Sequence, residues 1–381
     1  MNDMKNLAYN IERGPFIRSF LAASAGMFCF SRGLAADSLY DKVGKRNTKE
    51  ALFWDSSARG VQCTLCPNNC VISERKAGLC GVRKVSNSRL YTISYGNPCT
   101  ANIDPIEKKP LYHFMPGSRT FSIATAGCNL ACLNCQNWTI AKVTPDETNN
   151  YDLMPEAVVN RAVSGRCPVI AYTYTEPVTF FEYAYDTAVI AKERGLKNII
   201  KSSGYINPEP LRQWCEVMDA ANIDLKAFNN GTYLKLSGVR LQPVLDTLKI
   251  LKDNGVWLEI TNLVIPSWTD NLDEIRDMCK WLTDNGFSDT PLHFSRFHPM
   301  YKLDQLPPTP VETLFEAASI ATEEGIKFVY IGNVPGNDKE DTKCPKCGAV
   351  VIERQGYSIL LKNIADGKCI SCGETIPGVF N

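Results

Sequence analysis

Residues 127–135 read Gly-Cys-Asn-Leu-Ala-Cys-Leu-Asn-Cys, so that Cys128, Cys132 and Cys135 have the spacing C-x3-C-x2-C. This loop directly follows an apolar run, 120–125, that has the length and composition of a β-strand. Three thiolates can hold three irons of a 4Fe–4S cubane and leave the fourth iron without a protein ligand. Buried or zinc-binding thiols are the alternative, which an odd number of cysteines at this spacing disfavours. The loop therefore predicts an iron–sulfur site with one open coordination position.

Short apolar runs and helix-length amphipathic segments alternate along the chain from about residue 118. The predicted strands are 120–125, 169–174, 198–202, 221–225, 257–265, 292–297 and 328–331, and the predicted helices include 179–194, 208–220, 241–254 and 310–324. Glycines expected to adopt a left-handed cap conformation just after helices are Gly195, Gly255, Gly286 and Gly325. The alternation predicts an α/β fold with a parallel sheet, a partial or full (β/α) barrel. In such a barrel the chemistry lies where strands end and loops begin.

Two further cysteine groups flank this predicted barrel. Cys344, Cys347, Cys369 and Cys372 form two C-x2-C-G knuckles of the zinc-ribbon type, with rubredoxin-like iron as the alternative. Cys63, Cys66, Cys70 and Cys80 form another four-thiolate set, for which zinc, an auxiliary iron–sulfur cluster and unligated thiols all stay open. We expect a leader-like segment over 1–36, a cysteine-rich region over 37–117, the barrel over 118–337 and a four-cysteine ribbon over 338–381.

The cysteine loop also carries a family resemblance. Its motif matches the radical S-adenosylmethionine (radical SAM) superfamily. The continuation Cys135-Gln136-Asn137-Trp138 and the upstream segment 105–113, which reads PIEKKPLYH, resemble the branch related to pyruvate formate-lyase activating enzymes. More narrowly, they resemble the radical enzyme of the AmmeMemoRadiSam system. The resemblance covers about residues 50–380 and departs from the superfamily at Asn134, where an aromatic residue often contacts adenine; Trp138 is the candidate substitute.

The resemblance implies a function and partners. A radical SAM enzyme cleaves S-adenosylmethionine reductively at a 4Fe–4S cluster to give a 5′-deoxyadenosyl radical, which abstracts hydrogen from a substrate that this sequence does not identify. A one-electron donor of the flavodoxin or ferredoxin type and AmmeMemo-type proteins are the implied partners. The alternatives are an activase for a glycyl-radical enzyme and a non-catalytic electron-transfer or metal-binding protein. A ferredoxin closes each cluster with four ligands, whereas the barrel loop offers three.

The resemblance further implies roles for polar residues at the predicted strand ends. Glu176 lies in a segment similar to the superfamily's Gly-Gly-Glu-Pro element, which binds the methionyl amino group; a surface glutamate is the alternative. Ser202 and Ser203 lie in a segment similar to the one that contacts the ribose. Asp224 and Lys226 match an Asp-Leu-Lys element and, on one strand face, either point into the barrel mouth or form a structural ion pair.

The sixth predicted strand adds two candidates from its residues alone. Arg296 keeps its charge at all physiological pH values and suits an anionic substrate or the carboxylate of adenosylmethionine. His298 is the second candidate, because histidine is a residue type suited to moving protons near neutral pH, although a packed side chain is the common alternative.

The bulk composition limits the partners and the compartment. Lys plus Arg and Asp plus Glu both number 41, and the resulting formal charge of zero disfavours nucleic-acid binding. No apolar run reaches the roughly 18 residues of a membrane span. The 16 cysteines fall largely into tight clusters, which in a long chain indicate metal sites and a cytoplasmic location. The alternative is export, since residues 17–21 (IRSFL) resemble a twin-arginine leader; a short surface helix would also explain this segment.

Overall fold

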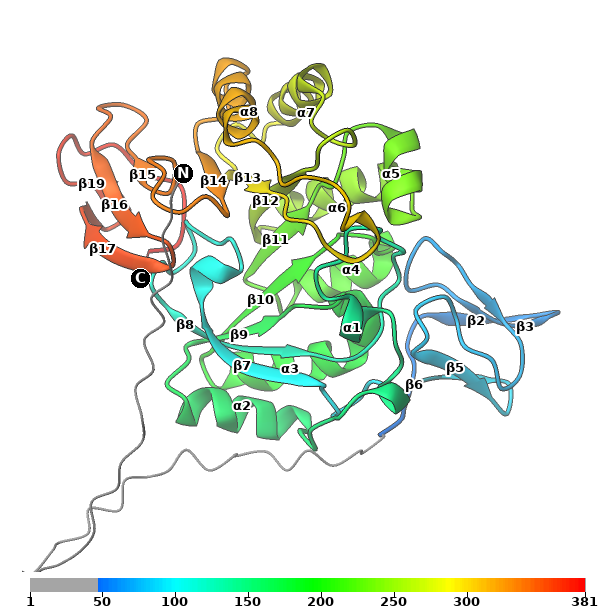
Figure 1. Ribbon diagram of the computed structural model, residues 1–381. Coiled ribbons are helices and arrows are strands. Elements are labelled where there is room, and N and C mark those ends of the chain that lie inside the picture. Colours follow the sequence, from blue (N-terminus) through cyan, green and yellow to red (C-terminus); the bar gives the residue numbers. More distant parts are fainter. Residues whose placement is uncertain (1–46, 381) are drawn as a thin grey trace, which may run out of the picture. The chain divides into compact units, whose positions relative to one another are not determined.

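An eight-stranded sheet is the main element of the computed structural model, which describes residues 47–380 (Figure 1). The strand order is β14-β13-β12-β11-β10-β9-β8-β7, with β8 to β14 parallel and β7 antiparallel to β8. The bounds are β7 Thr100–Pro105, β8 Arg119–Ala124, β9 Val169–Tyr172, β10 Lys197–Ser202, β11 Ala220–Asp224, β12 Trp257–Val264, β13 Leu292–Arg296 and β14 Val329–Gly332. Because β7 and β14 are the two edges of this sheet, the barrel is partial.

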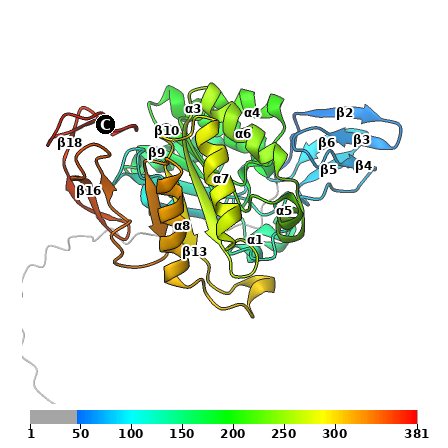
Figure 2. The ribbon, with the colours of Figure 1, turned by 90° about the horizontal axis from the view of Figure 1, so that it is seen from above.

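The crossovers between the parallel strands carry most of the helices (Figure 2). Their bounds are α1 Trp138–Ala141, α2 Pro155–Ser164, α3 Phe181–Glu193, α4 Pro208–Cys215, α5 Asn230–Ser237, α6 Gln242–Asp253, α7 Leu272–Asp284 and α8 Val311–Glu323. Short 3-10 turns are η1 Ile106–Lys108, η2 Pro145–Glu147, η3 Pro177–Phe180 and η4 Tyr301–Leu303. Helix α3 packs on β9 and β10, and α8 packs on β13 and β14.

Helix α7 shows how local sequence sets these crossovers. The Asn271 side chain caps the helix by accepting from the backbone N–H of Asp273 at 2.9 Å, which satisfies a donor that has no partner inside the helix. Its buried residues are Ile275, Met278, Cys279 and Leu282, which recur every three or four positions and form one apolar stripe. The stripe lies in the main hydrophobic core.

The seven predicted strands coincide with β8 to β14 to within two residues at each end. The four glycines expected to end helices have φ values between +72° and +93°, the left-handed region that only glycine enters without steric cost. The helix predicted over 208–220 was too long: α4 ends at Cys215, and the chain enters β11 at Ala220.

The N-terminal cysteine-rich segment forms two small antiparallel sheets. One has the order β2-β3-β4 and the other β1-β6-β5. Their bounds are β1 Lys49–Glu50, β2 Trp54–Ser57, β3 Gly60–Cys63, β4 Val71–Ile72, β5 Arg83–Ser86 and β6 Arg89–Thr92. Edge strand β7 also lies within the segment 37–117, and it joins the main sheet.

The C-terminal segment is a small β module with a three-stranded sheet, β15-β16-β17, and a hairpin, β18-β19. The bounds are β15 Thr342–Lys343, β16 Val350–Gln355, β17 Ser358–Lys362, β18 Ile364–Ala365 and β19 Lys368–Cys369. The guanidinium of Arg354 in β16 donates to the Tyr112 carbonyl at 2.7 Å, and Val379 donates its N–H to the His113 carbonyl at 2.7 Å. Both contacts fasten the module to the segment that precedes β8.

Among the described residues, no helix has the length and apolar character needed to cross a membrane. The leader-like segment predicted over 1–36 lies outside the described residues.

Candidate functional site

The three-cysteine loop connects β8 to α1, at the carboxyl edge of the parallel sheet. Backbone hydrogen bonds fix it on one side to α5: Ala131 donates to the Ser237 carbonyl at 2.8 Å and Leu133 to the Leu236 carbonyl at 2.9 Å. The ammonium of Lys142 donates to the Leu130 carbonyl at 2.7 Å. These bonds hold the loop in place independently of any bound group.

Gly127 allows this loop to approach the N-terminal segment closely. Its φ is +100°, and a Cβ there would lie 2.6 Å from Val82 Cγ1 and 2.8 Å from the Cys80 carbonyl oxygen. Such distances exclude a side chain, so glycine is required immediately before Cys128.

The three thiols of the loop are separated in a way that suits a cluster. Cys132 is buried, Cys128 and Cys135 are half-buried, and burial raises the pKa of the Cys128 and Cys135 thiols, with the nearby Cys132 adding to both shifts. Among the described residues, the three sulfurs do not all lie within 4.8 Å of one another. Thiolates around one zinc ion lie roughly 3.8 Å apart, given bonds of about 2.3 Å. A cubane keeps its thiolates further apart because each binds a different iron, so the loop fits a cubane.

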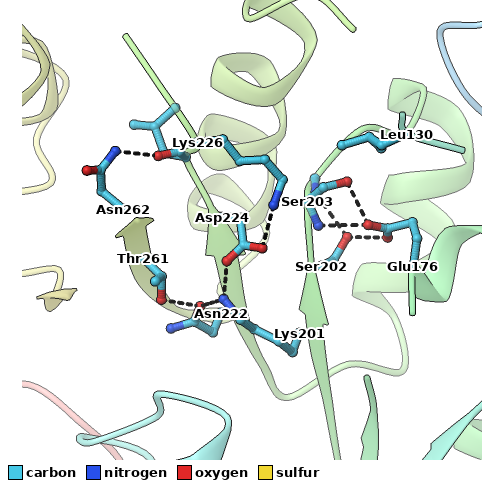
Figure 3. Close-up of polar contacts among 12 residues, drawn as sticks. Leu130, Glu176, Lys201, Ser202, Ser203, Asn222, Asp224, Lys226, Thr261 and Asn262 are labelled. Carbon is cyan, nitrogen blue, oxygen red and sulfur yellow. Dashed lines mark hydrogen bonds and ion pairs between the residues drawn. The ribbon is translucent and has the colours of Figure 1, made fainter. Parts of the chain in front are cut away.

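Glu176 follows β9 and is buried beside the cysteine loop, not on the surface (Figure 3). Its carboxylate accepts from the Ser202 hydroxyl at 2.6 Å, and from the Ser203 backbone N–H and hydroxyl at 2.8 and 2.6 Å. The Val178 N–H adds a longer bond of 3.3 Å. The structure therefore brings three of the predicted site residues together as one hydrogen-bonded unit at the ends of β9 and β10.

The backbone turns at Tyr174, two residues before Glu176, where the similar Gly-Gly-Glu-Pro element has glycine. The φ of Tyr174 is +63°, a left-handed conformation that is uncommon for residues other than glycine. The Asn137 side chain, two residues after Cys135, donates to the Tyr174 carbonyl at 2.7 Å. The turn after β9 is thereby bonded to the cysteine loop.

Asp224 lies at the end of β11 between two lysines (Figure 3). The ammonium of Lys226 lies 2.8 Å from its carboxylate, and Lys201 of β10 pairs with the other oxygen. Burial would raise the pKa of Asp224, but the two ammonium groups hold it well below its usual range. Burial opposes the charge of Lys226, yet Asp224, followed by the Cys132 thiol, raises its pKa well above the usual value. Lys226 is therefore a fixed cation beside the cysteine loop.

Lys201 is a site residue that we did not predict. Its ammonium also donates to Asn222 Oδ1 at 2.5 Å, and the Thr261 hydroxyl donates to the same oxygen at 2.8 Å. A lysine that directly follows the apolar pair Ile199 and Ile200 was the available signal, because a charge carried into the sheet needs a buried partner.

Two amide oxygens of the cysteine loop lack partners. Within the described part of the chain, the Oδ1 atoms of Asn129 and Asn134 are buried and accept no hydrogen bond. Buried polar atoms are normally paired, so each unpaired oxygen marks a place for a bound donor. This agrees with a site that is completed by a ligand.

The candidates on β13 lie in different surroundings. Arg296 ends β13, half-buried, and its Nε donates to the Thr309 carbonyl at 2.8 Å, which leaves the rest of the guanidinium for other partners. His298 lies exposed on the loop after β13. The nearby His293 is buried and lies 2.7 Å from the Glu259 carboxylate, which marks it as part of the packed core.

Trp138, the candidate adenine contact, begins α1 and is 41% exposed. Its ring stacks on that of Tyr301 with centroids 5.5 Å apart. Both rings lie next to loops at the carboxyl edge of the sheet, after β8 and after β13.

The C-terminal cysteines form a compact group of a different kind. All four sulfurs lie within 4.8 Å of one another, and the pairs Cys344–Cys372 and Cys347–Cys369 are 3.6 and 3.9 Å apart. These separations match the roughly 3.8 Å edge of a tetrahedron around one ion bound by thiolates. The geometry fits a single metal ion.

The fold and the three-thiol loop define a class of iron–sulfur barrel enzymes. Residues 122–282 match the family model described as the radical SAM superfamily. An uncharacterized protein of Methanocaldococcus jannaschii is 46% identical over 335 residues, covering 87% of this chain and all of the relative. The chain belongs to the radical SAM superfamily.

More distant relatives include activating enzymes. Pyruvate formate-lyase 1-activating enzyme of Escherichia coli is 26% identical over 229 residues, which cover 56% of this chain and 93% of that enzyme. Among solved structures, a radical SAM methyltransferase from Sphaerobacter thermophilus covers 58% of this chain and 68% of its own, with 13% identity and a TM-score of 0.45.

Proposed function

We propose that Cys128, Cys132 and Cys135 hold a 4Fe–4S cluster with one iron left open for S-adenosylmethionine, and that the chain uses the cluster and S-adenosylmethionine to abstract hydrogen from a substrate. Held by these three thiolates, the cluster would supply the electron for reductive cleavage of S-adenosylmethionine and so the oxidising power for removal of a hydrogen atom from the substrate. The observation that carries the proposal is the three-thiol loop, which directly follows β8 and is fixed by backbone hydrogen bonds at the carboxyl edge of the sheet.

The chain's own residues would bind and orient S-adenosylmethionine. Glu176, with Ser202 and Ser203, offers a buried anion beside Cys128, suited to the ammonium group and to the ribose hydroxyls. All four acceptor positions of the carboxylate are used in this structure, so an incoming ammonium would compete with the serine hydroxyls. Lys226 and Arg296 are the cations available for carboxylate groups.

The required electron would come from a flavodoxin- or ferredoxin-type protein, and AmmeMemo-type proteins are the other proposed partners. The ribbon cysteines would hold zinc, for which tetrahedral thiolate coordination is common.

The test is product formation by the anaerobically reconstituted chain. With a one-electron reductant, it should release 5′-deoxyadenosine and methionine in equal amounts. The triple replacement Cys128→Ala, Cys132→Ala and Cys135→Ala should abolish this release. Cleavage at the wild-type rate by the triple variant would refute the proposal.

A second candidate is activation of a glycyl-radical enzyme, which the similarity to pyruvate formate-lyase 1-activating enzyme favours. In that case the hydrogen would come from a backbone glycine of a protein substrate. A glycyl-radical signal in electron paramagnetic resonance, formed on a candidate partner only when the chain and S-adenosylmethionine are present, would distinguish it.

A further inference from the structure

The N-terminal cysteines surround a hollow that neither the radical SAM motif nor the ribbon accounts for. Its lining includes all four sulfur-bearing residues Cys63, Cys66, Cys70 and Cys80, together with apolar side chains. The empty space measures about 350 Å³, part of it open to solvent. Four thiols that line one hollow offer the ligand set that a metal ion or an iron–sulfur cluster needs.

The sulfur positions disfavour a single ion as that occupant. In the described part of the chain, no three of the four sulfurs lie within 4.8 Å of one another, whereas the four ribbon sulfurs do. The same chain therefore contains one compact four-thiol group and one expanded group. An expanded group around a hollow fits a cluster, in which each iron binds its own thiolate.

Polar groups at the hollow point to a ligand with hydrogen-bond acceptors. Arg83 is 1% exposed and lines the hollow; its Nη1 donates to both Glu182 oxygens at 2.9 and 3.1 Å, but its buried Nε has no partner among the described residues. Backbone N–H groups of Asn68 and Val82 donate to the thiols of Cys66 and Cys80. The inorganic sulfides and thiolates of a cluster accept such N–H donors, which also tune its potential.

Two contacts place the hollow against the cysteine loop of the barrel. The Asn68 side chain donates to the Asn129 carbonyl at 2.8 Å, and Asn129, next to Cys128, lines the hollow. The glycine before Cys128 packs on the Cys80 carbonyl. Asn207 at the start of α4 donates to the Thr64 carbonyl at 2.7 Å and holds the N-terminal cysteine loop to the barrel.

We propose that Cys63, Cys66, Cys70 and Cys80 bind a second iron–sulfur cluster, closed by four thiolates and directly adjacent to the radical SAM loop. Because every iron would have a protein ligand, this cluster does not bind S-adenosylmethionine. The inference goes beyond the proposed function, since cleavage of S-adenosylmethionine needs only the barrel cysteines.

The test uses the full chain with the triple replacement Cys128→Ala, Cys132→Ala and Cys135→Ala, purified anaerobically. It should retain iron with an equal amount of acid-labile sulfide, up to about four of each, and a spectrum that S-adenosylmethionine leaves unchanged. Adding Cys66→Ala should remove the iron and the sulfide. Adding Cys279→Ala, which deletes a buried thiol in α7 far along the chain from the hollow, should remove neither. The acid-labile sulfide distinguishes a cluster from rubredoxin-like iron in the ribbon, because such an iron site contains no inorganic sulfide.

Zinc in place of iron, or no sulfide in the triple variant, would overturn the inference. If the added replacements prevent folding, the wild-type chain decides: it should hold more than the four sulfides of a single cubane, and four or fewer would overturn the inference. If the second cluster is absent, the wild-type chain should still release 5′-deoxyadenosine. Failure of this inference is therefore distinguishable from failure of the proposed function.

Discussion

Glu176 combines burial, negative charge and four protein donors within hydrogen-bond distance, and it lies beside the thiol of Cys128. A carboxylate in this position costs free energy unless its charge is satisfied, and the serine hydroxyls do so while no cation is bound. At the residue scale, the structure thus places a buried, hydrogen-bonded carboxylate beside the cysteine loop.

Glu176→Gln removes the charge and replaces one acceptor oxygen with an N–H2 group that faces the donors of Ser202 and Ser203. S-adenosylmethionine should bind about 10- to 100-fold more weakly, because a charge-assisted hydrogen bond contributes roughly 1.5–3 kcal/mol. Calorimetric titration of the reconstituted chain measures this effect. Glu193→Gln at the exposed end of α3 is the matched control and should bind normally. Wild-type affinity in the Glu176 variant would contradict the assignment.

The limits of sequence reasoning at this scale are clear from Lys201 and Asp224. The motif indicated Asp224 and Lys226, of which Asp224 ends β11 and Lys226 lies two residues beyond the strand. The Lys201 partner depends on the register of β10 against β11, in which Lys201 lies opposite Asn222. Register follows from packing across the whole sheet, and a single strand sequence does not specify it.

At the scale of elements, the parallel strands were predictable because buried strands in such sheets are continuous apolar runs. Strand β7 was not predicted, since its burial pattern leaves several positions half-exposed or exposed, and its pairing with β8 is non-local. The helix over 208–220 was predicted too long because residues 216–219 continue an apolar pattern that the turn into β11 interrupts.

His113 links the segment before β8 to the C-terminal module. Its Nδ1 lies 2.6 Å from the Pro377 carbonyl oxygen and its Nε2 lies 2.6 Å from the Tyr330 hydroxyl, so Nδ1 carries a proton, because a carbonyl oxygen only accepts. Burial, partly opposed by the charge of Glu259, lowers its pKa from 6.5 to about 4. Between pH 4 and pH 6.5 the unfolded chain binds more protons at this histidine than the folded chain does. The stability that depends on neutral His113 is therefore fully present above pH 6.5 and is lost as the pH falls towards 4.

Lowering the pH from 7.5 to 5.5 should therefore reduce the free energy of unfolding of the wild-type chain by about 1.4 kcal/mol more than that of His113→Gln. The difference arises from the one pH unit between 6.5 and 5.5. Anaerobic urea unfolding at both pH values measures the difference, and the other buried histidine, His293, is common to both proteins. Equal pH dependence in the two chains would show that His113 does not titrate on unfolding.

At the scale of the whole molecule, three cysteine groups with different sulfur spacing are attached to one sheet or its flanking modules. Their positions in the sequence were evident, but their metal identity was not, because spacing along the chain does not give separations between sulfurs. The structure separates the compact ribbon group from the two expanded groups.

If the ribbon thiolates bind a single ion as proposed, Cys344→Ala should lose about one metal equivalent per chain and leave the iron–sulfur content unchanged. Elemental analysis of zinc and iron checks this, with Cys215→Ala at the end of α4 as the control for loss of one thiol. A metal content equal to that of the wild type would show that these four cysteines hold no ion.

The central claim is that the barrel loop leaves one iron open for S-adenosylmethionine. The most direct measurement is the electron paramagnetic resonance spectrum of the reduced, reconstituted chain before and after S-adenosylmethionine is added. The wild-type signal should shift on addition, and the variant that lacks the thiols of Cys128, Cys132 and Cys135 should show no shift, although it keeps any cluster bound elsewhere. A shift of equal size in that variant would place the binding of S-adenosylmethionine at another site and contradict the account.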